Sequence, residues 1–179
     1  KLPFSFPAKL TDCGAHAFDE LSYPGDSIKQ EYKEDILVGY RWHDTKKIPA
    51  LFPFGHGLSY TTFTYGKPVA SAKAMAADGT LTVTVAVKNT GSIAGKEIVQ
   101  LYVGDDKCSV LRPVKELKHF AKVGLAPGEE KNVTFTLTPD DLKFYDEASA
   151  AWKYEPGKFK AYVCASSADV RGVVSFEMQ

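Results

Sequence analysis

The sequence has no long apolar run and no surplus of positive charge, and these two absences exclude whole classes of protein. No stretch of its 179 residues approaches the roughly 18 consecutive apolar residues that a membrane-spanning helix needs. Lys and Arg number 22, and Asp and Glu also number 22. A global attraction to nucleic acid is therefore disfavoured, although a local basic patch is left open. We expect no membrane span and no nucleic-acid partner.

Cysteine is scarce, and its spacing carries no metal signature. Cys13, Cys108 and Cys164 are far apart, and the four histidines form no tight cluster. We predict free thiols, with one disulfide as the alternative, and neither a metal site nor a cofactor.

The first residues lack the features of a secretory leader. Lys1–Pro7 has no apolar core segment and no initiator methionine. A start of this kind is expected within a longer chain, so the missing leader says nothing about the compartment.

What the sequence does have is β alternation, from about Ser59 to Gln179. Apolar and polar residues alternate at 81–88, 99–103, 133–137 and 159–163. In the second of these runs, Gln100 and Tyr102 fall on the face opposite the apolar set. The turns at Ala126–Glu129 and Glu155–Lys158 have Pro second and Gly third, and Thr138–Leu142 reads as one capped helical turn. Short strands with intervening turns predict a mainly β protein, an antiparallel β-sandwich.

Residues 1–58 read instead as an irregular, aromatic-rich arm. Within it, 35–43 is predicted to form a short strand or an extended segment. The stretch Leu51–Phe63 joins the arm to the sandwich, and its Pro53, Gly55 and Gly57 prevent a continuous helix or ladder. Its aromatic residues are too apolar for a solvated linker. We therefore predict that this junction packs against another surface.

Several motifs, in order along nearly the whole chain, point to one family. They are the junction Leu51–Phe63, Tyr32–Asp44, Asn89–Gly91 with Ala94–Glu97, Arg112–Leu117, Leu125–Glu129 and Phe144–Asp146. Together they resemble the C-terminal part of family-3 glycoside hydrolases, the β-glucosidases and β-xylosidases, which carries a fibronectin type III-like domain.

The resemblance implies how the chain is divided and what the whole protein does. Residues 1–58 would be the end of an α/β-sandwich domain and an interdomain arm, and 59–179 the fibronectin type III-like, immunoglobulin-like sandwich. The enzyme would be a retaining β-glycosidase, best assigned as a β-glucosidase that removes terminal β-linked glucose from oligosaccharides. Its Asp nucleophile and Glu acid/base would lie upstream, so no catalytic residue is expected in this chain.

The partners implied are the upstream catalytic domains, in the same or a cleaved polypeptide, and a β-glucoside or oligosaccharide substrate. This chain would stabilise those domains and shape the aglycone side of the pocket. The resemblance favours a periplasmic or secreted location and leaves oligomerisation open. The alternative is a stand-alone carbohydrate-binding or adhesion module with a β-sandwich fold.

The residues themselves offer no convincing catalytic set. Glycoside hydrolysis needs two carboxyl groups flanking one bond, whereas the acidic pairs here, such as Glu34–Asp35, are adjacent and in extended structure point to opposite faces. His56 lies near Ser59, but no Gly-x-Ser-x-Gly elbow is present. We interpret His56 as a hydrogen-bonding residue that locks the junction loop.

Recognition-type residues concentrate at Tyr40–Asp44. Aromatic rings stack on sugar faces and Arg clamps carboxylates, yet the same residues serve equally well to join domains. We favour a packing role, in which Trp42 buries area and Arg41 pairs with a buried acid. The alternative places Trp42 or His43 at the rim of a substrate pocket. The residues predicted to pack between domains are Tyr40, Arg41, Phe52, Phe54, His56 and Tyr60.

Overall fold

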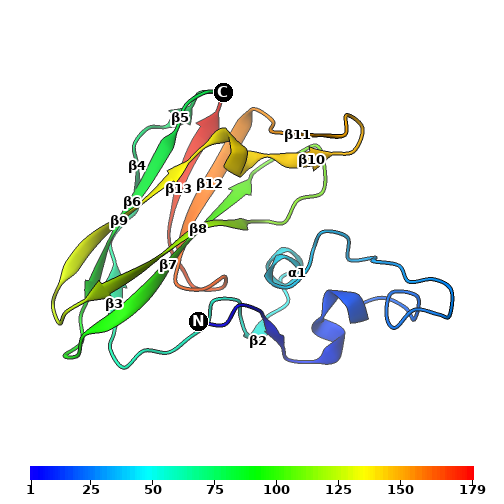
Figure 1. Ribbon diagram of the computed structural model, residues 1–179, viewed down its shortest axis with the longest axis horizontal. Helices are drawn as coiled ribbons and strands as arrows, with labels where there is room; N and C mark the ends of the chain where they lie inside the picture. Colours follow the sequence, from blue (N-terminus) through cyan, green and yellow to red (C-terminus); the bar gives the residue numbers. More distant parts are fainter.

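The computed structural model describes residues 1–179 and shows a β-sandwich with an arm along one side (Figure 1). The strand β6 (Leu81–Asn89) illustrates why the sandwich forms. Its alternate residues Leu81, Val83, Val85 and Val87 are all buried, whereas the intervening side chains are only half-buried or exposed. A two-residue period places one apolar face toward the opposite sheet. The predicted antiparallel, mainly β fold is confirmed.

Two sheets make the sandwich. The larger has the strand order β5-β13-β12-β7-β8, made of β5 (Ala74–Met75), β13 (Val170–Met178), β12 (Gly157–Cys164), β7 (Gly95–Asp105) and β8 (Glu116–Leu125). In the smaller, β6 pairs antiparallel with β9 (Glu130–Leu137) along nearly its whole length, and also with the short strands β3 (Phe63–Tyr65) and β4 (Val69–Ala70). A separate hairpin joins β10 (Phe144–Asp146) to β11 (Ala151–Lys153).

The core lies between the two sheets and comes from their inward faces. Eighteen buried apolar residues form one cluster, in which Phe159 of β12 stacks on Phe176 of β13 with ring centroids 5.8 Å apart. All eighteen lie after Ser59, so the sandwich has a core of its own.

The turn predictions are met in two places of three. Gly128 has a φ of +75°, as the third position of a type II turn demands. The capped turn is a 3₁₀ helix, Pro139–Leu142, and the Asp141 carboxylate accepts a hydrogen bond from the Thr138 backbone N–H at 2.8 Å. The turn predicted at Glu155–Lys158, with Gly157 third, is wrong. Gly157 has no positive φ and already begins β12, because its pairing with Met178 holds it extended.

The arm contains more regular structure than its sequence indicates. It has two 3₁₀ helices (Leu10–Asp12 and Gly14–His16), a helix α1 (Tyr40–Lys46) and a small sheet of β1 (Phe6–Pro7) and β2 (Ala50–Phe52). The strand or extended segment predicted for 35–43 is therefore wrong, because Asp35 lies in a turn with φ +56° and 40–43 are helical. Gly39, with φ +60°, turns the chain into α1, and Lys47 ends the helix in the left-handed conformation. No helix in the structure is long or apolar enough to span a membrane.

Candidate functional site

Helix α1 packs against the outer face of the larger sheet. The Tyr40 ring meets the Tyr102 ring edge to face with centroids 5.5 Å apart, and lies 5.1 Å from the Phe54 ring. The Tyr40 hydroxyl accepts a hydrogen bond from the Leu117 backbone N–H at 2.8 Å. Tyr102 and Gln100, on the outer face of β7, are consequently fully buried. The alternation of apolar and polar residues in 99–103 correctly predicts that both lie on the outer face, but it does not indicate that the arm covers that face.

Ion pairs fasten the same helix to β8 and its preceding loop. Lys115 pairs with Asp44 at 2.5 Å, and Arg41 pairs with Glu116 at 3.2 Å. Arg112, four residues before Glu116, also pairs with it, at 2.9 Å. The helical period explains why one face of α1 makes both the ring contact and the ion pair with the sandwich: Tyr40 and Asp44 lie one turn apart on that face.

Burial and neighbouring charge pull the pKa values of the two acids in opposite directions. Burial raises the pKa of the Asp44 carboxyl, and the Lys115 ammonium only partly offsets that effect. Burial also tends to raise the pKa of Glu116, but the charges of Lys118, Arg112 and Arg41 outweigh that effect and hold this pKa below its ordinary value. Glu116 is thus the acid that the cationic surroundings keep ionised.

Trp42 lies inside the arm and does not face the solvent. Trp42 is only 5% exposed, and its Nε1–H donates a hydrogen bond to the Asp12 carbonyl at 3.1 Å. The Phe18 ring meets it edge to face, and the Lys46 ammonium lies 5.4 Å from its ring centroid. These contacts fit the packing role better than a place on a substrate rim.

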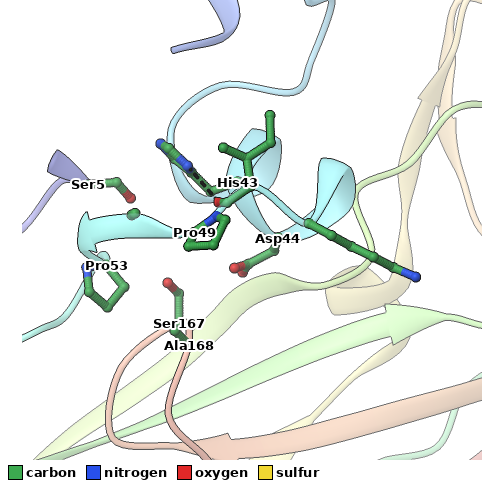
Figure 2. Close-up of a pocket in the computed structure, with 10 residues that line it drawn as sticks. Ser5, His43, Asp44, Pro49, Pro53, Ser167 and Ala168 are labelled. Atoms are coloured by element: carbon green, nitrogen blue, oxygen red, sulfur yellow. Dashed lines mark hydrogen bonds between the residues drawn. The ribbon is translucent and has the colours of Figure 1, made fainter. Parts of the chain in front are cut away.

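His43 lines a pocket of about 230 Å³ between the arm and the loop that joins β12 to β13 (Figure 2). Its Nδ1 is hydrogen-bonded to the Ile48 carbonyl at 3.0 Å. Ser5, Asp44 and Ser167 also line the pocket. No hydrogen bond joins His43 to either serine, so the pocket does not present an activated hydroxyl.

The junction residues behave in three different ways. Phe54 is half-buried under Tyr40, whereas Phe52 is partly exposed and packs on Phe6. His56 fixes the loop through its backbone: its N–H donates to Pro53 and its carbonyl accepts from Leu2. Its ring packs at a tilt on Phe52 with centroids 5.3 Å apart and makes no side-chain hydrogen bond within the chain, so the predicted locking role stays a prediction. Tyr60 is 99% exposed and packs on nothing within the chain.

The arm leaves a large amount of apolar surface uncovered. Thirteen large hydrophobic residues between Phe4 and Tyr60 are exposed: Phe4, Phe6, Leu10, Phe18, Tyr23, Ile28, Tyr32, Ile36, Val38, Leu51, Phe52, Leu58 and Tyr60. So dense an exposure in a third of the chain is typical of a surface that another protein surface covers.

Comparison with known proteins agrees with this geometry. Residues 97–167 match the family described as the fibronectin type III-like domain. The chain is 67% identical over 99% of its length to the β-glucosidase BoGH3A of Bacteroides ovatus, and 49% identical over 95% of its length to the thermostable β-glucosidase B of Acetivibrio thermocellus. The predicted resemblance is confirmed. Over nearly its whole length, the chain is similar to the C-terminal part of family-3 glycoside hydrolases.

Solved structures of such glycoside hydrolases superpose on the arm and the sandwich together. DesR, a β-glucosidase from Streptomyces venezuelae, matches 98% of the chain with a TM-score of 0.89 and 41% identity. β-Glucosidase 3B from Thermotoga neapolitana matches 99% with a TM-score of 0.86 and 35% identity. The chain spans 24% and 22% of the two curated relatives and 22% and 24% of these two structures.

Proposed function

We propose that this chain is the docking tail of a retaining β-glucosidase that releases terminal β-linked glucose from oligosaccharides. The observation that carries this is the 67% identity, over 99% of the chain, to a β-glucosidase of which it spans only 24%. The remaining three quarters of such an enzyme supply the nucleophile and the acid/base. The chain itself contributes no catalytic residue.

The arm and the sandwich have different tasks in this proposal. The sandwich, assigned to 59–179, is a self-supporting scaffold with its own core. The arm, assigned to 1–58, is fixed on that scaffold through Tyr40, Arg41 and Phe54, and turns its other side to the catalytic domains. Trp42 gives the arm its shape, and Phe52, His56 and Tyr60 lie where the domains meet. His43 stands nearest to a rim position, because it lines a pocket open between arm and sandwich.

A chimera tests the proposal directly. The segment of the Bacteroides ovatus β-glucosidase that matches this chain is replaced by the chain itself, and hydrolysis of an aryl β-glucoside is measured. We expect the chimera to hydrolyse the glucoside and the isolated chain to show no turnover. Turnover by the isolated chain that one carboxylate substitution abolishes would overturn the assignment.

The stand-alone module is the rival function, and the exposed arm argues against it. An independent binder must keep its apolar surface in water, where such a patch promotes association. We expect the isolated chain to self-associate in sedimentation experiments as its concentration rises. A strictly monomeric, highly soluble chain would favour the rival.

A further inference from the structure

A recess of about 490 Å³ lies between the β10–β11 hairpin, the loop 110–113, residues Asp35 and Ile36 of the arm, and the start of α1. Figure 1 shows this hairpin projecting from the sandwich on the side where α1 lies. The recess is larger than the one at His43, and its volume is in the range of small-molecule sites. Apart from Ile36, none of the thirteen exposed apolar residues between Phe4 and Tyr60 lines it.

Two exposed aromatic side chains line this recess. Tyr145 and Trp152 are directly opposite each other across the hairpin, and their rings meet edge to face with centroids 5.7 Å apart. Tyr145 is 50% exposed and Trp152 is 66% exposed. Each ring therefore holds the other in place while a large part of both remains open to solvent. Phe144, which also lines the recess, is buried.

The charged groups around the recess are largely neutralised by one another. Arg41 and Arg112 both pair with Glu116, at 3.2 and 2.9 Å, and Asp146 pairs with Lys153 at 2.8 Å. An anionic ligand would have to displace a carboxylate from Arg41 or Arg112, and a cationic ligand would face those two guanidinium groups and Lys143. A neutral ligand with many hydroxyl groups would need no such displacement, since a paired guanidinium or carboxylate keeps free donor or acceptor positions.

We propose that this recess binds a short neutral saccharide, one sugar ring of which stacks on Trp152 beside Tyr145. Its hydroxyl groups accept hydrogen bonds from Arg41 and donate to Asp146 and Glu147, which line the same recess. The aromatic pair supplies a flat apolar face, and the polar rim fixes the orientation of the ring. The site binds sugar without cleaving it.

The choice of a β-gluco-oligosaccharide as probe rests on the proposed function. Cellotetraose and laminaritetraose are titrated into the chain, with calorimetry and tryptophan fluorescence as readouts. The sequence has two tryptophans, and Trp42→Phe leaves Trp152 as the only tryptophan, whose emission is excited selectively. We expect saturable binding of at least one probe with a Kd on the order of 1 mM, and a change in Trp152 emission.

Matched variants locate the site. Trp152→Ala is expected to weaken binding by about tenfold or more, whereas Tyr145→Phe keeps the ring and should bind nearly as well as the parent. Phe120→Ala is the control, because Phe120 is 68% exposed on β8 and does not line the recess. Near-ultraviolet circular dichroism confirms that each variant is folded. Equal binding by Trp152→Ala, or equal loss in Phe120→Ala, overturns the proposal.

Two further outcomes separate this proposal from the docking function. Absence of saturable binding for both probes at concentrations on the order of 10 mM overturns the saccharide site, while hydrolysis by the chimera is unaffected by that result. Binding by the chain but not by the chimera means that the catalytic domains cover the recess, which overturns the site for the enzyme. Binding by both, lost in Trp152→Ala, supports it.

Discussion

Replacing Trp42 by alanine removes the residue around which the arm is built. Its ring lies edge to face with Phe18 and so near Gly14 that a Cβ added there would be 3.2 Å from it, and its indole N–H donates to the Asp12 carbonyl. Alanine leaves a cavity at this point and an acceptor without its donor. The arm segment 10–46 therefore loses both the packing and the hydrogen bond that join its 3₁₀ helices to α1.

The expected cost follows from burial. Truncating a buried Trp to Ala costs about 3–5 kcal/mol, and Trp42 is 5% exposed. Trp152→Ala is a matched control, since Trp152 is 66% exposed and an exposed substitution usually stays within about 0.5 kcal/mol. The two variants remove the same side chain, and only its environment differs.

Urea unfolding followed by circular dichroism measures the free energy, and hydrogen exchange reports protection of amides in the arm. We expect Trp42→Ala to lower the midpoint and to abolish protection across 10–46, and Trp152→Ala to do neither. Equal stability of the two variants would refute the packing argument. Unchanged stability of a Trp42→Ala chimera with a sharply raised KM would place Trp42 on the substrate rim.

Three further predictions concern the sandwich and its thiols. The pKa of Glu116 is lower in the folded state than in the unfolded state. Its contribution to the free energy of unfolding is therefore complete at pH values above the unfolded pKa near 4.5, and is lost as the pH falls through the lower folded pKa. Glu116→Gln should flatten this acid limb of the curve of stability against pH. Gly104→Ala should cost about 1–3 kcal/mol, because the new Cβ would lie 2.3 Å from the Val114 carbonyl oxygen, whereas Gly157→Ala meets nothing within 4 Å and should be nearly neutral; urea unfolding of both variants checks this. Burial raises the pKa of the Cys164 thiol to about 12, so Ellman's reagent at neutral pH should reach it only on unfolding, after the two partly exposed cysteines; early labelling of Cys164 would contradict the burial.

The sandwich could be predicted from sequence because its strands carry their own signal. The alternation from Leu81 to Val87 specifies both an extended conformation and its buried face, and no distant residue is needed to interpret it. The same holds for Gly128, because the positive φ that a type II turn requires at its third position favours glycine there. In both cases local chemistry and the final environment agree.

The arm could not be predicted in the same way because its structure depends on tertiary contacts. Helix α1 is only seven residues long, has no side-chain cap, and is rich in aromatic residues that also suit a strand. It forms because Tyr40 and Asp44 meet Tyr102 and Lys115 more than fifty residues away. For the same reason, nothing in the period of β7 indicated that its outer face is buried.

The recess was missed for a different reason. Tyr145 and Trp152 are seven residues apart, and only the hairpin register brings their rings together. Tyr145 belongs to the motif Phe144–Asp146, but no motif or periodic pattern in the sequence singles out Trp152.

The central claim, that the arm and its junction with the sandwich form a docking surface, is tested most directly at Tyr60 of the junction. Tyr60 is 99% exposed in the chain, so Tyr60→Asp should leave the isolated chain as stable as before. In the chimera it should lower the thermal inactivation midpoint, by the equivalent of about 2 kcal/mol for one lost buried side chain, while Phe120→Asp on β8 should not. An inactivation midpoint unchanged by Tyr60→Asp, or lowered equally by Phe120→Asp, would contradict the account.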